Sequence, residues 1–523
     1  MKKMVSLLLA LMMLMSLTGG ALAETAEKPT LTIMTPDYGF YKPYNEMKLY
    51  QDYEEATGVH IDWMMVPEAE FGEKLSLVLA TGDNMPDIIF GGLNESLVNN
   101  NVESGNFIAF DELIDNGYMP NLSKIFEQRP TLRTLWSNPD GKLYQLGRVE
   151  EMFGLIFVHG CHFINKVWLD KFDLEVPTTT EEYYNALKTF VENDANGNGI
   201  RDEIGLTFLD QPTNPWRNHS GFGSLWGSFG MPDTGDHIYV KDGKVLYTAN
   251  TESYKEGIAY FAKMYEEGLI DSEVFNQNEA QMVAKGTMDE NVFGSFMKWH
   301  STHAVGVERA KDYVPLPPLK GPDGHQEWSR ENLTELGGTQ YYCVITKACE
   351  DPELAARWLD HGFDPLVSIQ VNWGAIGEVY EYNDAGILVN KKPPEGMDDN
   401  DLRISSTPTK NPHAILSDYY DKYVIYPYDA AEMYAIREEY YFDYCNDEFY
   451  PEIKFNAEDT ERLSILQTDI NAIVDSYRVT WITEGGVEDE WEDYLAELED
   501  AGLEEYLAIK QAGYDRYMAS ISE

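Results

Sequence analysis

One short stretch of this 523-residue chain has oxygen-bearing side chains spaced to surround a cation. The sequence DANGNGIRDEIG (194–205) places Asp194, Asn196 and Asn198 at alternate positions and then reaches Asp202 and Glu203. Alternating carboxylate and amide oxygens with a glycine in the turn are typical of a calcium loop. No His or Cys lies in the loop, and their absence favours a hard cation over zinc. The spacing therefore predicts a calcium site.

Motifs for catalysis are missing from the same sequence. The chain has no H-E-x-x-H, no G-x-S-x-G and no phosphate-binding P-loop. A glycosidase would need a pair of carboxylates. With 90 acidic residues, however, such pairs arise anywhere by chance. We therefore expect a binding protein rather than an enzyme, with a secreted glycoside-active enzyme as the weaker alternative.

The N-terminus predicts export. Lys2 and Lys3 precede an apolar run from Met4 to Leu17, and Ala21-Leu22-Ala23 follows, which is the pattern of a signal peptide cleaved after Ala23 (1–23). The run is too short to span a bilayer. Because no cysteine lies near the cleavage site, we expect no lipid anchor. The mature protein should be extracytoplasmic and monomeric. The formal net charge of −51 argues against nucleic acid as a partner.

The pattern of the mature chain predicts an α/β fold. Short apolar strands alternate with amphipathic helices at 30–36, 48–57, 60–66, 71–81 and 87–90. This β-α-β-α-β order indicates a doubly wound sheet, and ligands of such sheets bind beyond the carboxyl ends of the strands. Later, Thr179 and Glu182 form a capping box before a helix over 181–192, whose apolar stripe is Tyr184, Leu187 and Val191. From about Ala414 the chain reads as mostly helical.

Six segments in the same order resemble extracellular solute-binding proteins of family 1. They are KLSLVLATGDNMPDI (74–88), GKLY (141–144), FINKVWLDK (163–171), VPTT (176–179), the helix at 351–363 with VNWGAIGEVY (371–380), and 463–483. The resemblance covers nearly the whole mature chain. It implies a two-lobed periplasmic-binding-protein-like fold (type II) with a helical C-terminal extension. It also implies a carbohydrate ligand, a hinge that closes over it, and the permease subunits of an ABC importer as partners. A peptide or another small solute stays open as an alternative ligand.

The resemblance also bears on the calcium loop, because the larger members of the family, including alginate-oligosaccharide binders, have a similar one. Position 12 of an EF-hand loop is a bidentate Glu. Here that position is Gly205, so Asp202 and Glu203 must replace it. The expected calcium ligands are Asp194, Asn196, Asn198, the carbonyl of Ile200, Asp202 and Glu203. We expect the ion to stabilise the fold and to perform no chemistry.

A sugar site combines aromatic rings with polar side chains, since sugars carry apolar C–H faces and rings of hydroxyls. Tryptophans in irregular, Gly- or Pro-flanked segments are the better candidates, because most aromatic residues belong to the core. The residues after the first and third strands and the polar neighbours of these tryptophans complete the set. The expected ligand residues are Asp37, Tyr38, Tyr41, Asn94, Arg148, Trp216, Trp226, Trp299, His300, Trp328, Trp373, Glu378 and Tyr380.

The proline-rich stretch VPLPPLKG (314–321) suggests an extended hinge strand. We therefore expect an N-terminal lobe of 24–148 plus 312–346 and a C-terminal lobe of 149–311 plus 347–523, with the calcium loop at 194–203 in the second. The four cysteines, Cys161, Cys343, Cys349 and Cys445, show no metal or redox spacing. Their pairing cannot be read from the sequence.

Overall fold

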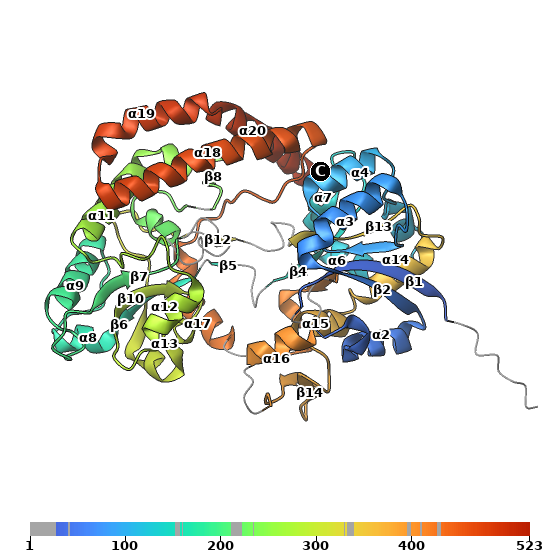
Figure 1. Ribbon diagram of the computed structural model, residues 1–523, viewed down its shortest axis with the longest axis horizontal. Coiled ribbons are helices and arrows are strands. Elements are labelled where there is room, and N and C mark those ends of the chain that lie inside the picture. Colours follow the sequence, from blue (N-terminus) through green and yellow to red (C-terminus); the bar gives the residue numbers. More distant parts are fainter. Residues whose placement is uncertain are drawn as a thin grey trace, which may run out of the picture.

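Two sheets, each with its own hydrophobic core, organise the chain into two lobes (Figure 1). This predicted α/β two-lobed fold is therefore confirmed. The computed structural model describes residues 28–39, 42–151, 157–158, 160–210, 222–233, 235–328, 330–331, 339–394, 399–407, 411–425 and 430–522. In this part of the chain, no helix is long and apolar enough to cross a membrane.

The first lobe contains a six-stranded sheet in the order β16-β4-β13-β3-β1-β2. Strand β1 pairs in parallel with β2 and with β3, while β13 runs antiparallel to β3 and β4. Its strands are β1 (Thr30–Asp37), β2 (His60–Pro67), β3 (Ile88–Phe90), β4 (Leu146–Glu150), β13 (Thr339–Ile345) and β16 (His413–Ile415). The helices are α2 (Lys48–Thr57), α3 (Glu68–Thr81), α4 (Glu95–Glu103), α5 (Asp111–Asp115), α6 (Pro120–Gln128), α7 (Pro130–Trp136), α14 (Pro352–His361), α15 (Pro365–Trp373) and α16 (Asp399–Ser406).

The second lobe contains a four-stranded sheet in the order β11-β6-β10-β7. Strand β6 runs antiparallel to β10 and β11, and β10 runs parallel to β7. The strands are β6 (Cys161–Asn165), β7 (Ile204–Thr207), β10 (Phe293–Lys298) and β11 (Tyr313–Leu316), with a separate hairpin of β8 (Ile238–Lys241) and β9 (Lys244–Tyr247). The helices are α8 (Lys166–Lys171), α9 (Thr180–Glu192), α11 (Glu252–Glu266), α12 (Glu279–Gly286), α13 (Thr302–Arg309) and α17 (Ala430–Tyr440).

Three C-terminal helices lie across both lobes (Figure 1). They are α18 (Ala457–Glu484), α19 (Val487–Asp500) and α20 (Leu503–Ser522). Their apolar faces join the second-lobe core, where α18 packs on α11. In addition, α18 contacts α4 and α20 contacts α7, which are first-lobe helices. The mostly helical C-terminal region expected from the sequence is therefore also a bridge between the lobes.

The chain passes between the lobes at places that differ from the expected boundaries. Strand β11 pairs with β6, so the proline-rich stretch belongs to the second lobe and not to a hinge. Helices α14 and α15 pack in the first-lobe core, and β16 pairs with β4. Residues 352–394, 399–407 and 411–415 therefore lie in the first lobe, in contrast to the expectation that 347–523 belongs to the second. The physical reason is that long-range strand pairing and helix burial determine to which lobe a segment belongs. Neither can be recognised from the residues that are adjacent in sequence.

Two small ribbons complete the structure. Strands β5 (Phe157–Val158) and β12 (Arg330–Glu331) pair where the chain passes between the lobes, and β14 (Tyr380–Tyr382) pairs with β15 (Leu388–Asn390). Single-turn 3₁₀ helices lie at 44–46, 248–250, 310–312, 417–419 and 442–444, and a longer one spans 222–228. Cys161, Cys343 and Cys349 are buried thiols without a disulfide.

Candidate functional site

The loop at 194–203 connects α9 to β7 in the second lobe. Helix α9 begins with the predicted capping box, in which Thr179 accepts from the N–H of Glu182 and Glu182 accepts from that of Thr179. At the far end, Asp194, Gly197 and Gly199 adopt positive φ angles of 41°, 80° and 80°, which curl the backbone into a tight loop. The Nζ atom of Lys171 donates to the carbonyl of Asp194 at 2.8 Å and so fixes the loop to α8.

Polar side chains of this loop point toward one another. Asp202 accepts hydrogen bonds from the amide nitrogens of Asn196, at 2.8 Å, and Asn198, at 3.0 Å. The backbone N–H of Gly199 donates to Asp194 Oδ2 at 3.1 Å, and that of Asn196 donates to Glu203 Oε1 at 3.3 Å. The arrangement gathers five of the six expected calcium ligands into one hydrogen-bonded ring.

Two carboxylate oxygens of the ring lack a hydrogen-bond partner although they are buried. They are Oδ1 of Asp194 and Oε2 of Glu203. A buried carboxylate oxygen without a donor is unfavourable, because it has lost water and gained nothing in return. A hard cation would satisfy both, and a half-turn of the Asn196 and Asn198 amides would add two more oxygens. The residues therefore fit calcium, although in the described part of the chain no group of three His, Cys, Asp or Glu side chains has metal-binding geometry.

Trp299 lies where the two lobes meet. Its ring packs against the first-lobe core and also against a buried cluster built from β6, β10, β11 and α17. Helix α17 reaches both sides in the same way, since Met433 is part of that cluster while Tyr434 packs against the first-lobe core. Figure 1 shows α17 between the second-lobe sheet and α16. Trp299 therefore has the position that the sequence led us to expect of a ligand residue, and a ligand contact by it stays a prediction.

His300 follows Trp299 directly and is buried. Its Nδ1 lies 2.6 Å from the hydroxyl of Thr302, and its Nε2 lies 3.6 Å from a carboxylate oxygen of Glu432 on α17. Just before Trp299, the ammonium of Lys298 pairs with Glu279. The ammonium of Lys298 thus already has a counter-charge within the second lobe.

Helix α17 also carries a residue that the sequence reasoning missed, Arg437. Its guanidinium carbon lies 4.0 Å from the ring centroid of Trp299. The sequence around Arg437 does not indicate this contact. The segment EMYAIREEYY (432–441) has the pattern of an ordinary charged helix, and Trp299 is far away along the chain. Only the fold brings the two side chains together.

Several expected ligand residues lie inside the hydrophobic cores instead. Trp226 is 2% exposed and packs against Tyr254 in a tilted arrangement and against Phe261 edge-on, and Trp328 is 2% exposed beside Tyr441. Tyr380 is fully buried in the first-lobe core. Packing accounts for these three positions, and a ligand contact by them stays a prediction.

The remaining first-lobe candidates have structural contacts of their own. Asn94 caps α4 by accepting from the N–H of Leu97, and Asp37 accepts from the N–H of Gly39 at 2.9 Å. Glu378 lies 3.7 Å from the ammonium of Lys42. The Trp373 ring lies 4.3 Å below the guanidinium of Arg403. Tyr38 follows β1 and is half-buried, whereas Tyr41 and Trp216 fall outside the described residues.

Arg148 lies in β4, next to the point where the chain leaves the first lobe. It is in register with His413 of β16. Burial first, and then the positive charge of Arg148, lowers the pKa of His413 to about 3. His413 is therefore neutral at physiological pH, which leaves the charge of Arg148 as the one cation of this pair.

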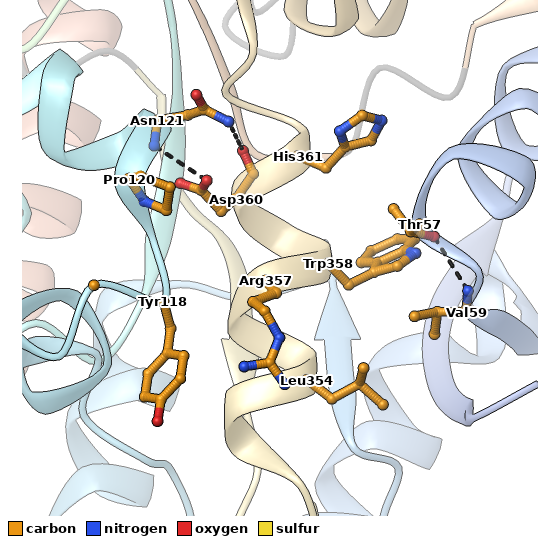
Figure 2. Close-up of a pocket in the computed structure, with 11 residues that line it drawn as sticks. Thr57, Val59, Tyr118, Pro120, Asn121, Leu354, Arg357, Trp358, Asp360 and His361 are labelled. Atoms are coloured by element: carbon orange, nitrogen blue, oxygen red, sulfur yellow. Dashed lines mark hydrogen bonds between the residues drawn. The ribbon is translucent and has the colours of Figure 1, made fainter.

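A pocket of about 350 Å³ is lined by first-lobe residues (Figure 2). It is formed by the end of α2, the turn before α6, and α14. Asp360 at its inner end accepts from the backbone N–H groups of Asn121 and Leu122 and so caps α6. Burial raises the pKa of Asp360 despite these bonds. Since all its walls belong to one lobe, closure of the lobes would not enclose a ligand there.

Comparison with known proteins agrees with this geometry. The family model "Bacterial extracellular solute-binding protein" matches residues 34–365. The chain is 36% identical over 507 residues to the fructooligosaccharide ABC transporter substrate-binding protein FusA of Streptococcus pneumoniae serotype 4, which covers 94% of this chain and 91% of that protein. It is also 25% identical over 324 residues to the polygalacturonan/rhamnogalacturonan-binding protein YtcQ of Bacillus subtilis, covering 61% of this chain and 60% of that protein.

Solved structures show the same relationship. FusA in complex with kestose superposes with a TM-score of 0.81 at 35% identity, covering 94% of this chain and all of that one. An EF-hand mutant of FusA in complex with fructo-nystose gives the same values. The matched family model and the sequence identity to FusA over nearly the full length of the chain support the same conclusion. This chain belongs to the bacterial extracellular solute-binding protein family.

Proposed function

We propose that this protein captures an oligosaccharide between its two lobes and presents it to the permease subunits of an ABC importer. The observation that carries the proposal is the 36% identity, across 94% of this chain, to a protein named for binding fructooligosaccharides. A fructooligosaccharide such as kestose is therefore the first ligand to test. The boundary around Trp299 supplies an aromatic ring next to cationic and imidazole groups, which suits a ring of sugar hydroxyls.

The two proposed lobes comprise the described residues of 28–151 with 339–425 and those of 160–328 with 430–522. A ligand that touches both lobes stabilises the closed arrangement by its differential affinity for it. Among the expected ligand residues, Trp299 and His300 lie at this boundary, and Arg148 lies at a crossing segment. Nothing further than binding and release is required of these side chains, so we propose no catalytic activity.

We further propose that calcium occupies the loop at 194–203. The support is the pair of buried carboxylate oxygens without partners on Asp194 and Glu203. Asn196, Asn198, Asp202 and the carbonyl of Ile200 would complete the ligands. A bound cation supplies positive charge to a concentrated set of acceptors and stabilises the folded loop. The loop lies between α9 and β7, remote from Trp299 in sequence, and its proposed role is structural.

We propose that the mature protein begins after Ala23 and works outside the cytoplasm as a monomer. The support is the signal-like composition of 1–23 and the extracellular character of the family. Its charge keeps it soluble and repels anionic surfaces.

Calorimetry with a panel of oligosaccharides tests the function. The panel contains kestose, nystose, alginate oligosaccharides and trigalacturonate, and the same mixtures are analysed for hydrolysis. We expect tight binding of at least one neutral oligosaccharide without turnover, and a smaller radius of gyration in small-angle scattering when it binds. Release of monosaccharide products, or binding of none of the panel, would contradict the proposal.

A further inference from the structure

Arg437 is a buried cation, and no acceptor faces one edge of it among the residues that the structure describes. The residue is 3% exposed. Its Nη1 donates to the carbonyl of Met433 at 3.2 Å, one turn earlier in α17. Its Nε and Nη2 atoms are buried and have no hydrogen-bond partner. The three N–H groups on these two nitrogens thus lack an acceptor in the described part of the chain.

A second buried arginine, Arg478, has the carboxylate partners that are expected of an arginine with a structural role. Arg478 of α18 is 5% exposed. Its Nη2 lies 3.0 Å from Asp210 and 3.0 Å from Asp475. A buried guanidinium without such a partner is strongly unfavourable. In a chain with 90 acidic residues against 39 basic ones, a missing carboxylate at Arg437 is a specific feature of its position.

The described ionisable groups around Arg437 do not supply a carboxylate partner for it. The residues with which it interacts electrostatically include the Cys161 thiol and the Tyr441 hydroxyl, which carry no charge at neutral pH because burial raises the pKa of each. Glu432, on the same helix, is 69% exposed and faces His300. The edge is held in place nonetheless, since the guanidinium carbon lies 4.0 Å from the centroid of the Trp299 ring.

The two atoms without partners form one side of the planar guanidinium. Nε–H and an Nη2–H point in parallel, so that this side donates two hydrogen bonds to a pair of neighbouring oxygens. Adjacent hydroxyls of a sugar ring and a carboxylate both offer such a pair. Next to Trp299, the ammonium of Lys298 is already paired with Glu279, and the imidazole of His300 faces Glu432. Among the described residues beside Trp299, Arg437 is therefore the cation that has donors to spare, which suits a pair of sugar hydroxyls better than the many carboxylates of a uronic acid chain.

We propose that the Nε/Nη2 edge of Arg437 donates two hydrogen bonds to adjacent hydroxyl oxygens of a neutral oligosaccharide, and that Trp299 holds the guanidinium in that orientation. This inference rests on the proposed sugar-binding function and names the chemical class of its ligand. Arg437 is then a specificity-determining residue, because hydrogen bonds to the sugar offset the cost of its burial, which stays uncompensated in the sugar-free protein.

Calorimetry of Arg437→Lys and Arg437→Met with kestose, nystose and trigalacturonate tests the inference. Lysine keeps the charge but lacks the parallel donors. We expect both variants to bind the neutral sugars at least about tenfold more weakly than the wild type. The control is Arg357→Lys, whose guanidinium also covers an aromatic ring, Tyr118 at 5.2 Å, but on the outer surface of the first lobe. Its affinity should equal that of the wild type.

A thermal melt without sugar separates this role from a structural one. Arg437→Met should melt at or above the wild-type temperature, because no ion pair is lost and an unpaired buried charge is removed. A lower melting temperature together with unchanged sugar affinity would overturn the inference, as would unchanged affinity alone in a wild type that binds kestose. Preferential binding of trigalacturonate would overturn the neutral class. Binding of no panel member by the wild type would instead remove the proposed function, and the inference with it.

Discussion

Arg478 and Asp210 form an ion pair at 3.0 Å that joins the long C-terminal helix α18 to the second lobe. Both side chains are almost fully buried, at 6% and 2% exposure. Breaking a buried pair from one side leaves an uncompensated charge, which costs about 3–5 kcal/mol. The pair therefore holds the three-helix extension against the body of the lobe.

Arg478→Met should lower the free energy of unfolding by roughly 3–5 kcal/mol, since Asp210 stays buried without its partner. Urea titration followed by circular dichroism measures the change. Arg462→Met is the matched control, because Arg462 pairs with Glu505 in the same extension but both are about half exposed. Its effect should stay below about 1 kcal/mol. Equal effects of the two changes would show that the buried pair is not what holds α18.

Lys454 gives the protein an unusual dependence of stability on pH. Its ammonium is fully buried and donates to the carbonyl of Trp136 at the end of α7. Burial lowers the pKa of Lys454 to about 7, whereas in the unfolded chain it is near 10.4. Between these two values the unfolded state binds more protons than the folded state. The free energy of unfolding contributed by this residue therefore rises as the pH increases from about 7 to about 10, and its penalty is complete below 7.

Lys454→Met should remove this slope and stabilise the protein most near pH 7. The carbonyl of Trp136 keeps a donor, because Gln145 also donates to it at 3.3 Å. Urea unfolding at several pH values between 7 and 9.5 measures the slope, to which Lys454 contributes at most about 1.4 kcal/mol per pH unit. The exposed Lys244→Met is the control and should leave it unchanged. A slope that persists in Lys454→Met would contradict the assignment.

The calcium proposal predicts a melting temperature that falls when a chelator is added. A ligand that binds only the folded state stabilises it by about 3 kcal/mol at a hundredfold excess over its Kd. Asp194→Ala should reproduce that loss and make the protein insensitive to the chelator. Asp170→Ala, which removes an exposed carboxylate paired with Lys166 on α8, should change neither. Sugar affinity should also change little in Asp194→Ala, whereas its disappearance in a folded protein would place the ion in the sugar site.

Local sequence patterns were sufficient for the first elements of the fold. The limits of α2 and of the strands at 30–36 and 60–66 agree with the structure to within one residue, and the capping box of Thr179 and Glu182 is present. These features depend on neighbours in sequence. The stripe on α9 was less accurate, because the helix buries Tyr183, Leu187 and Phe190 while Tyr184 and Val191 are half-buried. The observed buried face of α9 is thus rotated by about one residue around the helix axis from the face that the sequence predicted.

Long-range pairing explains what the sequence could not reveal. Pro315 suggested a hinge, yet β11 is an edge strand, where a proline is tolerated because one side of the strand needs no donor. The tryptophans in irregular segments were expected to be available to a ligand. Trp226 and Trp328, however, pack against aromatic residues that are far away in sequence. Arg437 was overlooked for the opposite reason, since its partner Trp299 is brought to it by the fold alone.

Trp299 is the proposed aromatic surface of the sugar site. Trp299→Ala should weaken binding of kestose by about tenfold, because it removes a stacking face and also releases the guanidinium of Arg437. The two losses then overlap. Calorimetry of Trp299→Ala, Arg437→Met and the double variant should give a combined loss smaller than the sum of the single ones, as expected for residues that act as a unit.

Trp63→Ala is the matched control, since Trp63 is also half-buried but packs within the first-lobe core alone. It should cost stability, by about 3–5 kcal/mol at most, and leave the affinity for kestose as it is. If instead Trp63→Ala weakens binding as much as Trp299→Ala does, the loss reflects general loosening of the fold. If the losses from Trp299→Ala and Arg437→Met are strictly additive, the two side chains contact the sugar independently, and Trp299 does not orient the arginine.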